Sequence, residues 1–206
     1  MERFAITISR ASGSGGRDIG RALADALGVN FYDRELLRLA SDESGIHEGL
    51  FGKADETPNL RMLLLAAKSV ANGDPLPPDS DDFISNENLF SYQAKVIREL
   101  ASKESCVIIG RCADYVLRDY PNVVRISIQA PLDYRVKAVM ALNDIDEREA
   151  KHRVELTDRR RSGYYRYFTG RDWLHSDNYD LCVNSAALSR EQCVKLIQSY
   201  LSIRFQ

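Results

Sequence analysis

The sequence predicts an α/β protein built on a parallel sheet that is flanked by helices. Short apolar runs of strand length recur along the chain, at residues 4–8, 106–109, 122–130 and 179–185. Helical patterns separate these runs, and that alternation is typical of parallel strands joined by crossover helices. A glycine-rich turn follows the first run, where α/β proteins often hold a phosphate group. We therefore expect one domain over residues 1–206, with a ligand site at this turn.

The composition is that of an ordinary soluble globular protein. The chain has 206 residues, of which 44% are hydrophobic and 28% charged, and its formal net charge is -2. This balance gives no general attraction to nucleic acid or acidic membranes. No apolar run is long enough to span a bilayer, and Glu2 and Arg3 precede only a short one, so we expect no signal peptide. We expect neither nucleic acid nor a membrane as a partner, and the oligomeric state stays open.

The cysteines and histidines do not form a metal-binding pattern. The four cysteines lack C-x-x-C spacing: Cys106, Cys112, Cys182 and Cys193. The three histidines are scattered along the chain: His47, His152 and His175. We therefore assign no metal ligands and expect a cytoplasmic protein with reduced thiols.

The first strand, the turn and the first helix occupy residues 4–28. The helical pattern after the turn ends at Gly28, whose position predicts a C-cap. Glycines allow a backbone to turn several N–H groups inward, and the helix adds the positive end of its dipole. We expect a phosphate-binding loop formed by Ser12, Gly13, Ser14, Gly15, Gly16 and Arg17. The alternative is a tight turn without a ligand.

The loop departs from the P-loop pattern G-x-x-x-x-G-K-[ST], whose lysine contacts phosphates and whose hydroxyl contacts magnesium. Aligned on its helix, the chain has Arg10 at the first glycine, Gly15 at the second, Gly16 at the lysine and Arg17 at the hydroxyl. Shifted by one residue, Arg17 becomes the cation and Asp18 lies near the metal. Neither alignment contains the lysine, so Arg17 is the basic candidate on the helix side of the loop.

A mostly helical insertion is expected over residues 31–102. Asp33 either caps the helix of residues 34–41, which we favour, or lies at the mouth of the site as a polar group. Residues 59–71 and 86–102 have the apolar spacing of helices. Between them, residues 72–82 are rich in proline and aspartate and indicate an exposed loop.

The second strand, residues 106–109, runs directly into Gly110 and Arg111. A glycine at the carboxyl end of a parallel strand lets the backbone approach a ligand, because ligands bind at that edge of the sheet. The planar guanidinium of Arg111 suits a phosphate. The alternative is a surface arginine, and the loop at Ser12 makes the phosphate role preferable.

A charged helical stretch follows the third strand, at residues 144–167. Its charges could form a solvated face with i,i+4 pairs. The run Arg159, Arg160 and Arg161, however, has few acids beside it and is followed by Gly163. This pattern predicts a mobile lid, residues 144–170, that brings arginines to phosphates. After the last strand, Ser189 is expected to cap a final amphipathic helix.

The order of these parts resembles the cytidylate kinase family, and more closely its divergent branch, the cytidylate kinase-like proteins. The resemblance spans nearly the whole chain. Four segments carry it: SRASGSGGRDIGRALADALG, FYDRELLRLASDESGI, IIGRCADYVL and NYDLCVNSAALS. They are similar, in order, to that family's phosphate loop with its first helix, the start of its nucleoside monophosphate region, its Gly-Arg-Asp motif and its last strand with the following turn.

This resemblance implies a P-loop kinase-like fold and an ATP- and Mg2+-dependent nucleoside monophosphate kinase that acts on CMP or a related small acceptor. The loop, with Asp18, would hold the donor triphosphate. Arg111 would grip the acceptor phosphate, with Arg38 and Asp33 as further acceptor residues. The catalytic arginines would be Arg17, Arg159, Arg160 and Arg161.

Two departures from the family keep a second hypothesis open. The family's aspartate after Gly-Arg is Cys112 here, and the loop lysine is missing. Both favour a non-catalytic protein that holds a nucleotide on a kinase scaffold.

Overall fold

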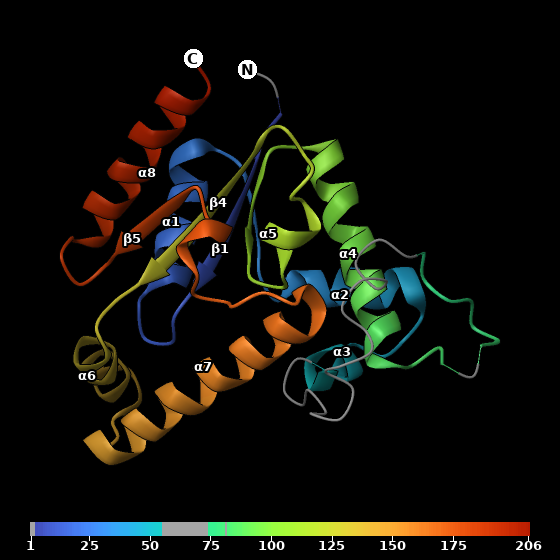
Figure 1. Cartoon of the computed structure of the whole chain (residues 1–206), viewed down its shortest axis with the longest axis horizontal. Coiled ribbons are helices and arrows are strands. Elements are labelled where there is room, and N and C mark those ends of the chain that lie inside the picture. Colours follow the sequence, from blue (N-terminus) through green and yellow to red (C-terminus); the bar gives the residue numbers. More distant parts are fainter. Residues whose placement is uncertain (1–2, 55–73, 81) are drawn as a thin grey trace.

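The structure, a computed structural model, describes residues 3–54, 74–80 and 82–206. Five parallel strands form one sheet in the order β2-β3-β1-β4-β5 (Figure 1). In chain order they are β1 (Ala5–Arg10), β2 (Asn30–Tyr32), β3 (Cys106–Ile109), β4 (Val123–Gln129) and β5 (Leu181–Asn184). The predicted fold class, a parallel sheet flanked by helices, is confirmed.

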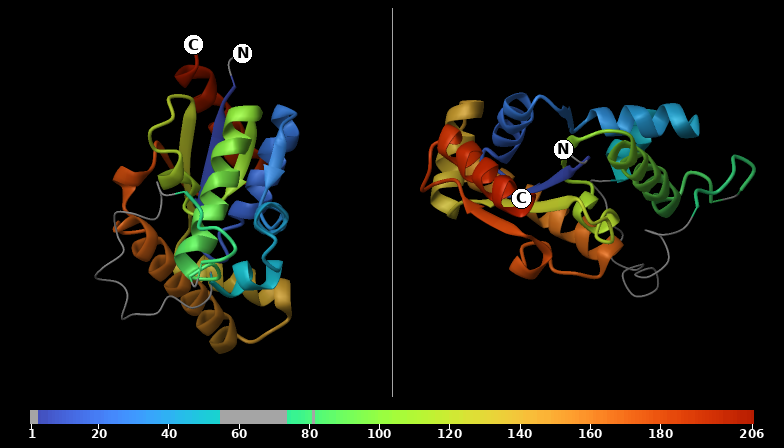
Figure 2. Two further views of the ribbon diagram at one scale, coloured as in Figure 1. Left: turned by 90° about the vertical axis from the view of Figure 1, so that its right-hand side faces the viewer. Right: turned by 90° about the horizontal axis from the view of Figure 1, so that it is seen from above.

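Helices cover both faces of this sheet (Figure 2). Those before β4 are α1 (Gly16–Leu27), α2 (Glu35–Ser44), α3 (Glu48–Ala54), α4 (Asn86–Lys103) and α5 (Ala113–Val116). Those after it are α6 (Leu132–Asn143), α7 (Glu147–Thr169) and α8 (Arg190–Arg204), with a short 3-10 turn at Ser176–Asn178. No helix of the described residues combines the length and apolar character needed to cross a bilayer.

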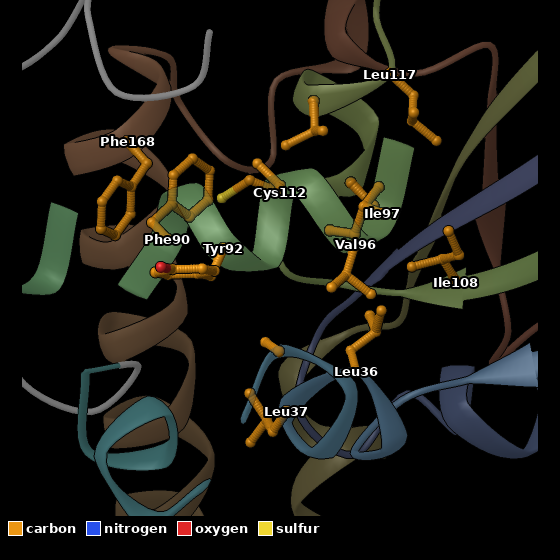
Figure 3. Close-up of a cluster of buried hydrophobic side chains, with 14 of the residues drawn as sticks. Leu36, Leu37, Phe90, Tyr92, Val96, Ile97, Ile108, Cys112, Leu117 and Phe168 are labelled. Carbon is orange, nitrogen blue, oxygen red and sulfur yellow. The ribbon is translucent and has the colours of Figure 1, made fainter. Parts of the chain in front are cut away.

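Two hydrophobic clusters lie on opposite faces of the sheet, because successive side chains of a strand alternate between faces. Ile6 and Ile8 of β1 belong to the cluster that packs against α1 and α8. Cys106 and Ile108 of β3 belong to the cluster shared with α2, α4 and α7 (Figure 3). In this second cluster the ring of Phe90 on α4 stacks on Phe168 of α7 at 4.1 Å between centroids. This packing joins α7 firmly to the body of the protein.

The helix ends confirm two sequence predictions. Gly28 caps α1 with φ 66°. Ser189 forms a capping box with Gln192 at the start of α8. The prediction of a helix over residues 59–71 lies outside the described residues. Phe31 and Tyr32, the first residues of the expected insertion, belong to the edge strand β2, and the division into insertion and lid stays a prediction.

Gly163 does not break the charged helix. α7 runs without interruption from Glu147 to Thr169, so Gly163 lies within a continuous helix, and the mobile lid stays a prediction. A glycine inside a helix costs only about 1 kcal/mol relative to alanine. Tyr164, Tyr165 and Phe168, which follow it, are buried, and their packing outweighs that cost.

Asp114 on α5 is a buried carboxyl that makes stability depend on pH. It accepts a hydrogen bond from the Tyr165 hydroxyl at 2.6 Å, and burial raises its pKa to about 6. A raised carboxyl pKa means that the folded state binds the proton more tightly, so the free energy of unfolding falls as pH rises from about 4 to 6. Asp114→Asn keeps an acceptor for Tyr165 and removes the ionisation.

We therefore expect Asp114→Asn to be more stable than the wild type above pH 6, by up to about 3 kcal/mol, and to lose that advantage near pH 4. Urea unfolding of both proteins between pH 4 and 8 measures this difference. Asp119→Asn, which changes an exposed carboxylate nearby, is the control. Parallel pH profiles for wild type and Asp114→Asn would contradict the prediction.

Candidate functional site

Three segments meet at the carboxyl edge of the sheet: the loop after β1, the turn after β3, and α7. Parallel strands present their carboxyl ends at one edge, which is where open α/β sheets bind ligands. Figure 1 shows the long helix α7 crossing below these strand ends. These segments and Asp33, which follows β2, form the candidate site.

The loop of residues 11–15 is held in one conformation. Gly13 and Gly15 have φ angles of 78° and 71°, in the left-handed region that favours glycine. The Ser14 hydroxyl is buried and donates to the Ala11 carbonyl at 2.8 Å, while Ser185 donates to the Ser14 carbonyl at 2.7 Å. With Gly15 as N-cap, the first N–H groups of α1 have no partner within the helix. They offer an anion the positive end of the helix.

Helices α6 and α7 pack against this loop. Arg135 of α6 donates to the Ser12 carbonyl at 3.1 Å, and Asp158 of α7 accepts from the Ser12 N–H at 2.8 Å. Arg135 and Asp158 also form an ion pair with each other. A Cβ at Gly13 would lie 2.5 Å from the backbone oxygen of Arg135. The helix pair therefore contacts the loop through both side chains and backbone.

Four arginines surround one carboxylate beside the loop. Asp33 is buried, and its Oδ2 lies 2.6 Å from Nε of Arg17 while its Oδ1 lies 3.9 Å from Nη2 of Arg10. Burial lowers the pKa values of Arg111 and Arg161, and the charge of Asp33 partly offsets both shifts, so Asp33 acts on all four arginines. Asp158, which pairs with Arg135, also acts on Arg161. Two carboxylates thus face five guanidinium groups, and the surplus of positive charge suits an anion.

The arginines are held close at an energetic cost. Burial lowers the pKa of Arg10, Arg111 and Arg161, and Arg161, Arg111 and Arg17 lower that of Arg10 further. Guanidinium groups stay protonated in proteins, so the cost remains as repulsion and lost hydration. A bound polyanion would relieve both.

The turn that presents Arg111 has an unusual backbone. Gly110, Arg111 and Cys112 have φ angles of 71°, 58° and 52°, three left-handed residues in succession. Side chains rarely adopt this region, and such strain is found mostly at binding sites. The Ala113 N–H donates to the Gly110 carbonyl at 3.0 Å, and the Val116 N–H donates to Cys112 at 2.9 Å, which holds the turn. Strand β3 and helix α5 thus fix the backbone position from which the Arg111 side chain extends.

Sequence reasoning favoured Asp33 as a helix cap, and that interpretation is wrong. The N-cap of α2 is Arg34, and it has no side-chain cap bond. The Asp33 carboxylate turns toward the arginines instead, because an ion pair with Arg17 and the field of three more cations outweigh one cap bond.

The predicted site residues do not all meet. The loop residues, Arg17, Asp33, Arg111 and Arg161 come together. Arg159 and Arg160 are exposed on α7, and Arg38 is exposed on α2. Asp18 is exposed and lines a surface hollow between α1 and α8. The roles assigned to these residues stay predictions.

Three residues of the site were not predicted from sequence: Arg10, Arg135 and Asp158. The sequence contained one sign that Arg10 belongs to the site: Arg10 occupies the first glycine position of the P-loop alignment. Arg135 and Asp158 contact Ser12 from 123 and 146 residues away. No local sequence pattern predicts contacts between residues so far apart in the chain.

The chain is similar to known kinases over most of its length. The model of the cytidylate kinase-like family matches residues 5–187. A cytidylate kinase from Methanopyrus kandleri is 23% identical over 203 residues, which cover 94% of this chain and 91% of that protein. A uronate isomerase from Corynebacterium glutamicum is 33% identical over 101 residues, but these cover 47% of this chain and 19% of the isomerase. This last match is too partial to assign an activity.

Solved structures share the fold. An uncharacterized protein from Eubacterium ventriosum has a TM-score of 0.70 and 25% identity, with 97% of this chain and 99% of that chain covered. A shikimate kinase from Bacteroides thetaiotaomicron has a TM-score of 0.56 and 14% identity, with 97% and 98% covered. Fold and family together indicate a nucleotide kinase. With a family match that extends from the first strand to the turn after the last, the chain belongs to the cytidylate kinase-like family.

Proposed function

We propose that this protein transfers the γ-phosphoryl group of ATP to a nucleoside monophosphate, CMP or a related small acceptor. The observation that carries the proposal is the set of four arginines around Asp33, placed between a phosphate-type loop and the turn after β3. Phosphoryl transfer needs alignment, charge neutralisation and exclusion of water more than covalent help from the protein. Guanidinium groups supply the charge and the alignment.

The donor side would be the loop and the start of α1. Gly13, Gly15, Gly16 and Arg17 would present backbone N–H groups and the helix dipole to the phosphates, whereas the Ser14 N–H donates to the Ala11 carbonyl. ATP would supply the phosphoryl group, and Mg2+ on its phosphate oxygens would neutralise part of their charge. The described residues contain no group of three or more acidic, histidine or cysteine side chains able to hold a metal. Mg2+ is usually bound by substrate phosphates and one or two carboxylates, and Asp18 and Asp33 are the candidate carboxylates here.

The acceptor side would be the turn after β3. Arg111 lies just after the carboxyl end of a central strand and interacts electrostatically with Asp33, as Arg161 and Arg10 do. An acceptor phosphate bound to Arg111 would thus lie close to the donor phosphates. Arg161 reaches the same place from α7, where its Nη1 donates to the Arg10 carbonyl at 3.0 Å.

A second function has support from one observation. Arg17, the basic residue at the start of α1, is bound to Asp33 at 2.6 Å, and the loop has no lysine. A protein that binds a nucleotide without turning it over is consistent with this arrangement. Turnover decides between the two.

A coupled assay with ATP, Mg2+ and a panel of nucleoside monophosphates tests the proposal, with titration calorimetry for binding. Arg111→Ala should raise the KM for the acceptor at least tenfold, because the phosphate loses a bidentate partner, and should leave the ATP KM within about threefold. Arg38→Ala, which changes an exposed arginine on α2, is expected to have the smaller effect on the acceptor. Nucleotide binding without turnover of any acceptor would favour the second function.

A further inference from the structure

We propose that Arg10 supplies the fixed loop cation of this protein and contacts the β- and γ-phosphates of the bound nucleoside triphosphate. In the P-loop pattern a glycine ends the strand and a lysine begins the helix. In this chain Arg10 ends the strand and Gly16 begins the helix, so the two positions have exchanged their roles. This inference rests on the proposed function and names the residue that replaces its missing lysine.

The exchange follows from the space between the two positions. A Cβ at Gly16 would lie 2.5 Å from Cβ of Arg10 and 3.3 Å from its Cγ. Real Cβ atoms do not approach so closely, so a side chain at position 16 and the observed side chain of Arg10 exclude each other. The loop has room for one long side chain here, and this chain places it on the strand.

The Arg10 side chain runs from the end of β1 toward the acceptor side. Its Nη1 lies against Gly110, where a Cβ would collide with it. Gly110 immediately precedes Arg111, so the guanidinium spans the distance between the loop and the acceptor turn. The Arg161 side chain donates to the Arg10 carbonyl at 3.0 Å and so holds the Arg10 backbone in place.

The Arg10 guanidinium is available for a ligand. Its side chain is 21% exposed, and its closest carboxylate oxygen, on Asp33, lies 3.9 Å away, beyond hydrogen-bond distance. This guanidinium carries five N–H donors but donates no hydrogen bond to another residue in the described part of the chain. A phosphate oxygen would supply the missing acceptors.

Arg17 is less suited to this role. Its side chain is 53% exposed, and its Nε is bound to Asp33 at 2.6 Å. Its charge is already paired and its position is less constrained. The arginine at the start of α1 thus forms a close ion pair with Asp33, whereas the arginine at the end of β1 has only a long one.

The test compares Arg10→Ala, Arg10→Lys, Arg10→Gly and the double variant Arg10→Gly with Gly16→Lys, each checked for folding by circular dichroism. Arg10→Ala should lower kcat/KM for ATP by about 10²-fold or more, since arginines on transferred phosphates are worth factors of about 10³ to 10⁵. Added guanidinium should restore part of this loss, and Arg10→Lys should retain more activity than Arg10→Ala. Arg17→Ala should lose less than Arg10→Ala.

The decisive comparison is the double variant. It restores the P-loop order of glycine and lysine, so it should recover at least tenfold over Arg10→Gly. Gly16→Lys alone should be less active than the double variant, because the lysine and Arg10 compete for one space. A double variant no better than Arg10→Gly, or Arg10→Ala within threefold of wild type, overturns the inference.

Nucleotide binding separates this inference from the proposed function. Titration with ADP and with a non-hydrolysable ATP analogue should show at least tenfold weaker binding to Arg10→Ala than to wild type. If wild type binds nucleotide without turnover, the proposed function fails, and this binding difference still decides the role of Arg10. If wild type binds no nucleotide, both are overturned.

Discussion

Arg161→Ala is expected to lower kcat by about 10³-fold while changing the KM values far less. Arg161 is half-buried on α7, and its Nη1 donates to the Arg10 carbonyl at 3.0 Å, so it lies over the junction of β1 and the loop. Charge develops on the phosphoryl oxygens in the transition state, and a guanidinium placed there stabilises it more than the ground state. Steady-state kinetics with saturating ATP and acceptor measure the effect.

Neighbouring arginines on the same helix provide the comparison. Arg153→Ala removes an exposed arginine that pairs with Glu149, and it should leave kcat within about twofold of the wild type. Arg159→Ala and Arg160→Ala should have much smaller effects than Arg161→Ala, because both side chains are exposed. Arg161→Lys should recover part of the loss. Equal losses at positions 159, 160 and 161 would show that α7 moves during turnover and that this conformation does not identify the arginine that acts.

The run Arg159, Arg160 and Arg161 shows the limit of sequence reasoning at this site. The pattern singled out the segment that contains Arg161, because an arginine run with few acids beside it is unusual. It could not choose among the three, because successive residues of a helix point about 100° apart and the packing of the helix decides which faces the sheet. Burial of Tyr164 and Phe168 sets that rotation, and it turns Arg161 toward the loop.

The sheet could be predicted because each strand carries its own local signal. β3 occupies the predicted residues, and β1 extends two residues beyond the predicted strand to include Arg10. That extension matters, because it makes Arg10 part of a rigid strand and not of a flexible turn. The contacts of Arg135 and Asp158 with Ser12 join distant segments, and no periodicity or spacing contains that information.

Asp33 illustrates the same limit in a single residue. An aspartate before a helix is statistically a cap, and the local sequence offers nothing against that interpretation. The arginines that form ion pairs with the Asp33 carboxylate lie on β1 and α1, and these elements reach Asp33 only after the sheet has formed. Long-range charge thus overrides a local preference worth about 1 kcal/mol.

Gly13→Ala is expected to lower the free energy of unfolding by more than 2 kcal/mol and to weaken nucleotide binding at least tenfold. The added Cβ would lie 2.5 Å from the backbone oxygen of Arg135, so either the loop or α6 must move. A backbone carbonyl cannot turn away as a flexible side chain can. Movement of the loop would also disturb the bonds of Ser12 with Arg135 and Asp158.

Gly15→Ala is the control that distinguishes the steric clash at Gly13 from the strain of a left-handed backbone. Gly15 belongs to the same loop, has a similar φ of 71°, and a Cβ there would meet nothing within 4 Å. Its substitution should therefore cost only the left-handed strain, about 1 kcal/mol. Urea unfolding and ADP titration of both variants measure the difference.

If Gly13→Ala is no worse than Gly15→Ala, the contact between the loop and α6 is loose, and the helix pair α6–α7 does not set the conformation of the phosphate loop. A clear difference would mean that α6 and the loop form one rigid unit, and that movement of this helix pair must be transmitted to the bound phosphates.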